Sequence, residues 1–146
     1  MNSQDRVVAR YLTAHGQVDE ATAKLTQVSN LLSTLQASLK LVDDLVAAGE
    51  RRRIGRVSDI NVGVIDFDES RVTARVVGTT GHYDVRITVT PRRGHHCTCP
   101  DWAQNGQRVG PCKHVLALGL SWKNENLLPA TDIIINNLDD ILQRVV

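Results

Sequence analysis

Two kinds of hydrophobic periodicity divide the chain. Between residues 18 and 48, apolar side chains recur at alternating intervals of three and four positions, which is typical of an amphipathic helix. They are Val18, Ala21, Leu25, Val28, Leu32, Leu35, Leu39, Val42 and Val46. Asp19 can cap this helix and Gly49 can end it. The pattern therefore predicts one long helix that ends near residue 48, preceded by a short helix over residues 4–14 that ends near Gly16.

The long apolar stripe could pack within one chain or join two chains. Its flanking positions carry few charge pairs, and Leu31 and Leu45 widen it. Charged flanks normally select the partner in a coiled coil, whereas a wide stripe suits burial against other helices or a sheet. We therefore expect intramolecular packing, or a homodimer through the N-terminal helix, ahead of a free two-stranded coiled coil.

From residue 51 the apolar period changes to two. RIGRVSDINVGVI is predicted as a first strand, and DFDES as a turn. RVTARVVG and HYDVRITVT each alternate strictly, with GTTG as a tight connection between them. Their apolar faces are formed by Val72, Ala74 and Val76 and by Tyr83, Val85, Ile87 and Val89. This pattern predicts an antiparallel β-meander with one buried face and one polar face.

The remainder of the chain is predicted to be mostly helical. Residues 100–110 are rich in Gly, Pro, Asn and Asp, so they indicate a loop with room for one helical turn. Pro111 suits the first turn of a helix that runs to about Lys123. Pro129 and Thr131 open a last helix. Its apolar face is formed by Ile134, Leu138, Ile141, Leu142 and Val145.

The composition indicates a cellular location and shows an uneven distribution of charge along the chain. The 146 residues contain no apolar run long enough to span a membrane and no secretory signal, so we expect an intracellular protein without membrane contact. The net charge of +1 conceals a basic middle: residues 51–123 carry 12 basic and 6 acidic side chains. A concentration of positive charge favours a polyanionic partner, and a solvated, arginine-rich sheet surface is the plainer interpretation.

All three cysteines lie within the segment CTCPDWAQNGQRVGPCKH, which His114 closes. Clustered thiols in a reducing compartment are more often metal ligands than disulfides. Cys97, Cys99, Cys112 and His114 make a complete tetrahedral set, and such a closed site is structural rather than catalytic. Sulfur ligands favour zinc or an iron–sulfur cluster, but the common clusters take a fourth thiolate that this chain lacks. The segment therefore predicts one structural zinc ion.

The ligand spacing constrains the local backbone. Cys97 and Cys99 point to one face of an extended strand, but their sulfur atoms converge only if the chain bends, and Pro100 follows at once. Cys112 and His114 would diverge by about 200° on a regular helix. Cys112 should therefore lie at or before the start of a helix, with His114 in its first turn. Buried cysteines beside an unrelated histidine, and a Cys–His nucleophile, are the alternatives.

The order Cys97-x-Cys99-Pro100-Asp101-Trp102, followed by Pro111-Cys112-Lys113-His114 and an apolar helix, resembles a SWIM-type zinc finger. The resemblance covers about residues 50–122, because the predicted meander is similar to the strands that precede the finger in that family. It implies a ββα zinc module credited with DNA binding or protein–protein interaction. Such modules often accompany helicases, transposases or ubiquitin-pathway proteins, yet this chain lacks the phosphate-loop motif of an attached motor.

Together these patterns predict an α+β protein: a small antiparallel meander with a ββα zinc finger, flanked by N-terminal helices and a C-terminal helix. The expected segments are 1–49 for helix packing or dimerisation, 50–123 for the meander and finger, and 124–146 for the last helix. His95 and His96 could compete as ligands, although a solvent-facing or supporting position suits them better. Trp102 could stack on a base, but packing over the metal and core is favoured.

We expect no enzymatic activity, because the sequence offers neither an open metal position nor an acid–base constellation. The expected function is that of a nucleic-acid-binding accessory or regulatory factor; the alternative is an adaptor whose finger and helices recruit a protein partner. Phosphate contacts would depend on the basic stretch, to which Arg51 and Arg71 also belong. The candidate contacts are Arg52, Arg53, Arg56, Arg75, Arg86, Arg92, Arg93, Arg108 and Lys113. Lys113 could instead offset the negative charge of the zinc centre.

Overall fold

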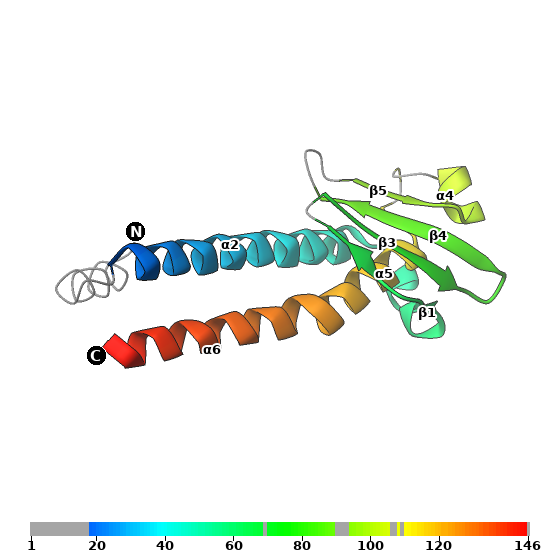
Figure 1. Cartoon of the computed structure of the whole chain (residues 1–146). Helices are drawn as coiled ribbons and strands as arrows, with labels where there is room; N and C mark the ends of the chain where they lie inside the picture. The colour runs from blue at the N-terminus through cyan, green and yellow to red at the C-terminus, as the bar shows by residue number, and fades with distance from the viewer. Residues whose placement is uncertain (1–17, 69, 90–93, 106–107, 109, 146) are drawn as a thin grey trace. The chain divides into compact units, whose positions relative to one another are not determined.

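The computed structural model describes residues 18–145, apart from 69, 90–93, 106–107 and 109. The predicted helix at 4–14 therefore lies outside the described residues. The chain divides into two compact units: Met1–Ala37 with Leu128–Val146, and Ser38–Leu127. The second unit contains the sheet and the cysteine-rich segment (Figure 1).

Helix α2 runs from Val18 to Ala48, so the predicted long helix is confirmed. The backbone N–H of Gly49 donates to the carbonyl of Val46 at 3.0 Å and closes the last turn. Within the second unit, the end of α2 buries Leu41, Val42 and Leu45. Further toward its N-terminus the helix belongs to the first unit, where Leu31 is 48% exposed.

The prediction of a strand from residue 53 is wrong over its first half. Arg51–Ile54 form the short helix α3, and Val57–Asp59 form a 3₁₀ turn. Strand structure begins only with β1, Asn61–Val62. The apolar residues Ile54, Val57 and Ile60 are spaced by three, which suits helical turns, and alternation starts after Ile60.

The sheet is antiparallel and follows the order β1-β3-β4-β5, with β2 also pairing with β3. Its further strands are β2 Asp66–Phe67, β3 Arg71–Val77, β4 His82–Thr88 and β5 Gly94–Cys97. The β1–β3–β4 part confirms the predicted meander, and β5 adds a further strand beside β4. In the predicted DFDES turn, Asp66 and Phe67 are instead paired as strand β2, because the chain continues along β3 beyond β1.

β1 and β2 lie along the same edge of β3 with a one-residue shift in register between them. Val62 is opposite Val76, whereas Asp66 is opposite Thr73, so one extra residue is accommodated on the β1–β2 side. This is the geometry of a β-bulge. Gly63 lies at the bulge, where a side-chain carbon would come within 2.8 Å of the Arg75 carbonyl oxygen.

The inner face of the sheet packs on helix α5, Lys113–Trp122. That face is formed by Val72, Ala74, Val76, Val85 and Ile87, all of which are buried. Gly119 of α5 lies between both of its neighbours: a side-chain carbon there would make ordinary van der Waals contacts, 3.7 Å from Val42 and 3.8 Å from Ile87. The core of the second unit therefore has the sheet on one side of α5 and the end of α2 on another.

One π-helical turn, Lys123–Leu127, joins α5 to α6, Leu128–Val145. The predicted last helix is thus confirmed, although it begins earlier than expected because the connection is itself helical. Ile134 and Leu138 are half-buried, while the side chains of Ile141, Leu142 and Val145 lie outside those described. Among the described residues, none of the helices has the length and apolar character needed to cross a membrane. The predicted α+β class is confirmed.

Candidate metal centre

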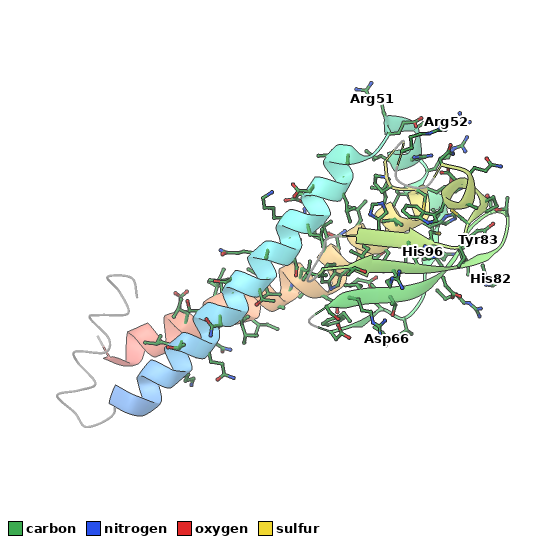
Figure 2. All side chains as sticks on the ribbon, turned by 90° about the horizontal axis from the view of Figure 1, so that it is seen from above. Arg51, Arg52, Asp66, His82, Tyr83 and His96 are labelled. Carbon is green, nitrogen blue, oxygen red and sulfur yellow. The ribbon has the colours of Figure 1, made fainter. Side chains whose placement is uncertain are left out.

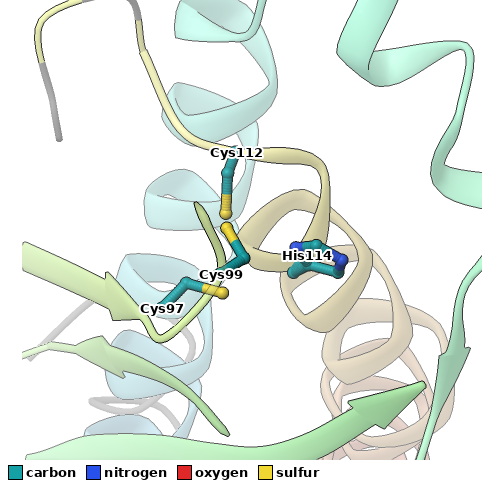
Figure 3. A group of neighbouring side chains, drawn as sticks. All are labelled: Cys97, Cys99, Cys112 and His114. Atoms are coloured by element: carbon teal, nitrogen blue, oxygen red, sulfur yellow. The ribbon is translucent and has the colours of Figure 1, made fainter. Parts of the chain in front are cut away.

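Four side chains from three consecutive elements converge at one end of α5 (Figure 3). Cys97 ends β5, Cys99 precedes α4 (Pro100–Asn105), Cys112 caps α5, and His114 lies in the first turn of α5. The potential ligand atoms of the four residues all lie within 4.8 Å of one another. All four side chains are buried, so the structure brings together the complete set that the sequence predicts.

The chain bends at Cys99, one residue after the strand pairing ends. Thr98 extends the ladder beyond Cys97: its N–H donates to the Asp84 carbonyl at 3.2 Å, and its hydroxyl accepts the Asp84 N–H at 3.0 Å. Pro100 then begins α4. The Cys99 sulfur accepts the backbone N–H of Trp102 at 3.3 Å, the position that a capping side chain takes at a helix start.

Cys112 is the N-cap residue of α5, without a side-chain cap hydrogen bond. Its backbone is extended, with φ −70° and ψ 165°, and its carbonyl accepts the first helical hydrogen bond, from Leu116 at 3.1 Å. The helix begins at Lys113, so His114 lies in its first turn as the spacing predicts. Two helix starts are thus directed at the sulfur cluster, and the positive ends of the helix dipoles favour thiolate over thiol.

The three thiols cannot all be ionised without a cation. The Cys112 and Cys99 side chains, together with burial, raise the pKa of the Cys97 thiol far above its usual range. Hydrogen bonds from Cys112 and Cys97 lower the pKa of Cys99. For Cys112, the hydrogen bond with Cys97 lowers the pKa, but the hydrogen bond with Cys99 and burial prevail and raise it to about 11. A divalent cation among the sulfurs would remove this conflict, because a coordinating thiol is deprotonated outright.

The imidazole of His114 is prepared for a metal rather than for hydrogen bonds within the protein. Both of its ring nitrogens are buried and lack a hydrogen-bond partner among the described residues. Figure 3 shows one edge of the ring facing the three sulfur atoms. Such unpartnered buried groups are rare in proteins, and coordination of an ion would account for one of the two nitrogens.

The environment of His114 fixes the ring orientation. The Tyr83 ring lies 4.7 Å from it, centroid to centroid, and the Tyr83 hydroxyl is 2.6 Å from the hydroxyl of Thr80. On another side, a carbon added at Gly78 would approach His114 Nε2 to 2.9 Å. The β3–β4 hairpin therefore holds the imidazole in place, and Gly78 leaves the space that the ring needs.

Three thiolates and one imidazole at these separations fit one structural zinc ion. All four ligands come from the protein, so the ion's part would be to join the end of the sheet to the start of α5. A site of this kind contributes directly to folding free energy.

Comparison with known protein families agrees with this chemistry. Residues 88–123 match the SWIM zinc finger family. The matched segment contains all four ligands, so the resemblance seen in the sequence is confirmed. No curated protein and no solved structure matches the chain. Residues 38–87, which supply the hairpin around His114, lie upstream of the matched segment.

The other aromatic and imidazole groups of the SWIM-type finger form a separate cluster. The rings of His95 and His96 lie 4.9 Å and 5.9 Å from Trp102, both edge-on. His95 shares the inner face of the sheet with Ile87, and its burial lowers its pKa. Neither histidine belongs to the set of four converging donors. Trp102 packs against β5 through these contacts.

The predicted phosphate contacts fall in different places. Arg52, Arg53, Arg56 and Lys113 line one hollow of about 310 Å³, together with Glu50 and Asp101. Arg75 and Arg86 line another, of about 550 Å³, on the outer face of the sheet beside Arg71 and His96. Figure 2 shows Arg52 projecting from α3, with His96 and Asp66 on the sheet. Arg108 is exposed between α4 and α5, and Arg92 and Arg93 lie outside the described residues.

Two residues that support the ligands were not singled out from the sequence as functional. Tyr83 was assigned to the apolar face of a strand, and Gly78 to a tight connection. Their spacing in V-G-T-T-G-H-Y is a signal only once the hairpin is known to face the first turn of α5. Asp101 likewise belongs to the finger motif, but its partner Arg53 lies 48 residues away.

Proposed function

We propose that the chain is a non-enzymatic zinc-binding accessory factor that binds nucleic acid through the hollow formed by α3 and the start of α5. The observation that supports this is the grouping of Arg52, Arg53, Arg56 and Lys113 around one concavity beside the zinc ligands. We call this concavity the basic hollow. Its two acidic members are Glu50 and Asp101.

Charge favours the basic hollow over the outer face of the sheet. Asp101 is already engaged by Arg53 at 2.7 Å, which leaves three cationic side chains opposite Glu50 alone. On the sheet, by contrast, three arginines share a concavity with Asp66 and Asp84, and Arg75 lies 3.6 Å from Asp84. The basic hollow therefore offers more uncompensated positive charge to a phosphate backbone.

The zinc ion would contribute to nucleic-acid binding indirectly. Lys113 lies between two ligands in sequence, so metal binding fixes the start of α5 and with it the position of that ammonium group. Contacts of Arg and Lys with phosphate carry no sequence information directly. Binding should accordingly be weakly sequence-specific and sensitive to salt. Three reduced thiols suit the reducing interior of a cell, in line with the proposed intracellular location.

The experiment compares two variants that remove the same charge from different surfaces. Arg52→Gln/Arg56→Gln alters the basic hollow, and Arg71→Gln/Arg75→Gln alters the sheet. Fluorescence anisotropy with short single- and double-stranded DNA at two salt concentrations measures binding. Loss of two phosphate contacts should lower the salt slope by about two in the hollow variant. Absence of wild-type binding at low salt, or equal weakening by the sheet variant, would overturn the proposal.

A second candidate function rests on the helices of the first unit. Large apolar side chains there are exposed, namely Leu31, Leu128, Ile133 and Ile135. Exposed apolar groups on helices suit association with a protein partner or a second copy of the chain. Sedimentation equilibrium over a wide concentration range tests self-association. A homodimer should weaken in the Leu31→Gln/Ile133→Gln variant, and a chain that stays monomeric at high concentration would contradict the dimer.

A further inference from the structure

Two arms of chain adjoin the zinc ligands Cys99 and Cys112. The first arm is α4, which follows Cys99. The second is the Gly110–Pro111 segment, which leads into Cys112. Bringing the two arms together closes a loop of chain, which costs conformational entropy. Without other contacts between the arms, metal coordination alone would have to offset this cost. A side chain that joins the arms independently of the metal would therefore prepare the site for zinc.

Arg53 makes such a connection from α3, outside the segment that matches the SWIM family. Its Nη2 lies 2.7 Å from Asp101 Oδ1 on the first arm, and its Nη1 donates to the Gly110 carbonyl at 3.3 Å on the second. The Arg53 side chain is only 13% exposed and that of Asp101 35%, so water screens this pair less than a surface ion pair. Asn105 also donates to Asp101 Oδ1, at 2.8 Å.

The second arm is held from another direction as well. Gly110 has φ +90°, a conformation that favours glycine. A side-chain carbon at Gly110 would lie 2.5 Å from the Ala48 carbonyl oxygen at the end of α2. The arm thus passes directly over the α2 terminus before reaching Cys112. The end of α2 and α3 together form a support against which both arms are fixed.

We propose that Arg53 is a positioning residue for the zinc site, and that the functional finger extends upstream to the Ala48–Arg53 segment. By bridging Asp101 and Gly110, the guanidinium holds the Cys99 and Cys112 sulfurs at the separation that the ion requires. Its planar fork can donate to both arms at once, which a lysine ammonium does with less geometric control. Preorganisation of this kind raises affinity chiefly by lowering the ordering cost. The inference does not depend on nucleic-acid binding.

The test uses the full-length zinc-loaded chain and a matched pair of variants on α3. Arg53→Met removes the bridge; Arg52→Met removes the same charge from an exposed neighbour in the same helix. Zinc transfer to a chromophoric chelator gives the release rate. Arg53→Met should release zinc about tenfold faster, in the range found for groups that support metal ligands, while Arg52→Met should match wild type.

Cobalt substitution provides a readout that a general loss of stability would not move. The absorption bands of Co²⁺ bound to thiolates report the ligand geometry directly. They should shift in Arg53→Met and remain unchanged in Arg52→Met. If Arg53→Met does not fold, Asp101→Asn and Arg53→Lys serve the same purpose, with Arg53→Lys expected to restore part of the wild-type rate.

The Arg53 bridge also predicts that the effects of substituting Arg53 and Asp101 on zinc release are coupled. Because Arg53 acts through Asp101, the double variant Arg53→Met/Asp101→Asn should release zinc no faster than the more affected single variant. Wild-type release from Arg53→Met, equal effects of Arg52→Met and Arg53→Met, or additive effects of Arg53 and Asp101 would each overturn the inference. DNA titration of the zinc-saturated proteins is a separate measurement, so failure of the proposed function leaves this result intact.

Discussion

The two halves of α2 have the same amphipathic pattern but different surroundings. In the Ser38–Leu127 unit, Leu41 is 4% exposed and Val42 is fully buried. In the first unit, Leu31 is 48% exposed, and Leu25 is the one large apolar side chain buried among those described. Of the two leucines that widen the stripe, Leu31 is exposed but Leu45 in the second unit is only 8% exposed, so the widened face is buried where the core of that unit supplies a surface.

The two units should also differ in stability. The second unit contains the core of the sheet, α5 and the four metal ligands, whereas the described part of the first unit consists of α6 and part of α2. Regions with few buried apolar contacts open locally at lower free energy. The second unit should therefore respond strongly to changes in its core or its metal, and the first unit weakly.

Removal of zinc should have the largest effect. A structural Cys₃His site contributes on the order of 10 kcal/mol of apparent binding free energy, so chelation should unfold the Ser38–Leu127 unit. Trp102 and Trp122 both lie in that unit, and their fluorescence reports its unfolding. Metal analysis that finds no zinc in the undenatured protein, or a Cys112→Ala variant as stable as wild type, would contradict the assignment.

A matched pair of leucines on α2 tests the contrast directly. Leu41→Ala creates a cavity at a buried position of the second unit and should cost about 2–5 kcal/mol of unfolding free energy. Leu31→Ala, on the same helix but half exposed, should cost less than about 1 kcal/mol. Urea denaturation of both variants measures the difference. Equal costs would contradict the difference in burial between the two leucines.

Gly78→Ala should lower the stability by an intermediate amount and should alter the geometry of the metal site. The added methyl would approach His114 Nε2 to 2.9 Å, so either the ring or the hairpin must shift. Overpacking of this kind costs about 1–3 kcal/mol, and the Co²⁺ spectrum should change with it. Gly94→Ala is the control, since the nearest atom to its new carbon is 4.0 Å away. A Gly78→Ala spectrum identical to wild type would contradict the predicted contact.

The smallest expected effect concerns the β2–β3 turn. Asp68 Oδ1 accepts the Ser70 N–H at 2.7 Å and the Arg71 N–H at 2.9 Å, and these bonds hold the pKa of Asp68 below its ordinary value. A lowered folded-state pKa means that the ionised carboxylate stabilises the turn above its unfolded pKa. This contribution is lost as the pH falls through the folded value.

Asp68→Ala should therefore lower the melting temperature slightly at pH 7. Its difference from wild type should shrink as the pH is lowered toward the ordinary carboxyl range. Differential scanning calorimetry of both proteins at several pH values measures this trend. A difference that grows with acidity would have the wrong sign for a depressed pKa.

Local pattern explains why some elements could be predicted and others not. β3 and β4 alternate strictly over seven residues each, so periodicity identified them. In contrast, Arg51–Asp59 contain two apolar residues spaced by three, too few to separate a strand from short helical turns. The π-helical turn at Lys123–Leu127 joins two helices that follow one another in the chain, and no single residue in it predicts a turn of that kind.

The sequence by itself determined the chemistry of the metal centre. Three thiols and one imidazole in this order allow few other uses, and the i, i+2 spacings require a bend at Cys99 and a helix start at Cys112. Only the tertiary structure decided what surrounds that centre. Arg53 and Asp101, like Gly78 and His114, are far apart in sequence, and their contacts exist because α3 and the β3–β4 hairpin fold back onto the start of α5. Ligand identity is a property of side chains, whereas their support depends on which distant segments share a surface.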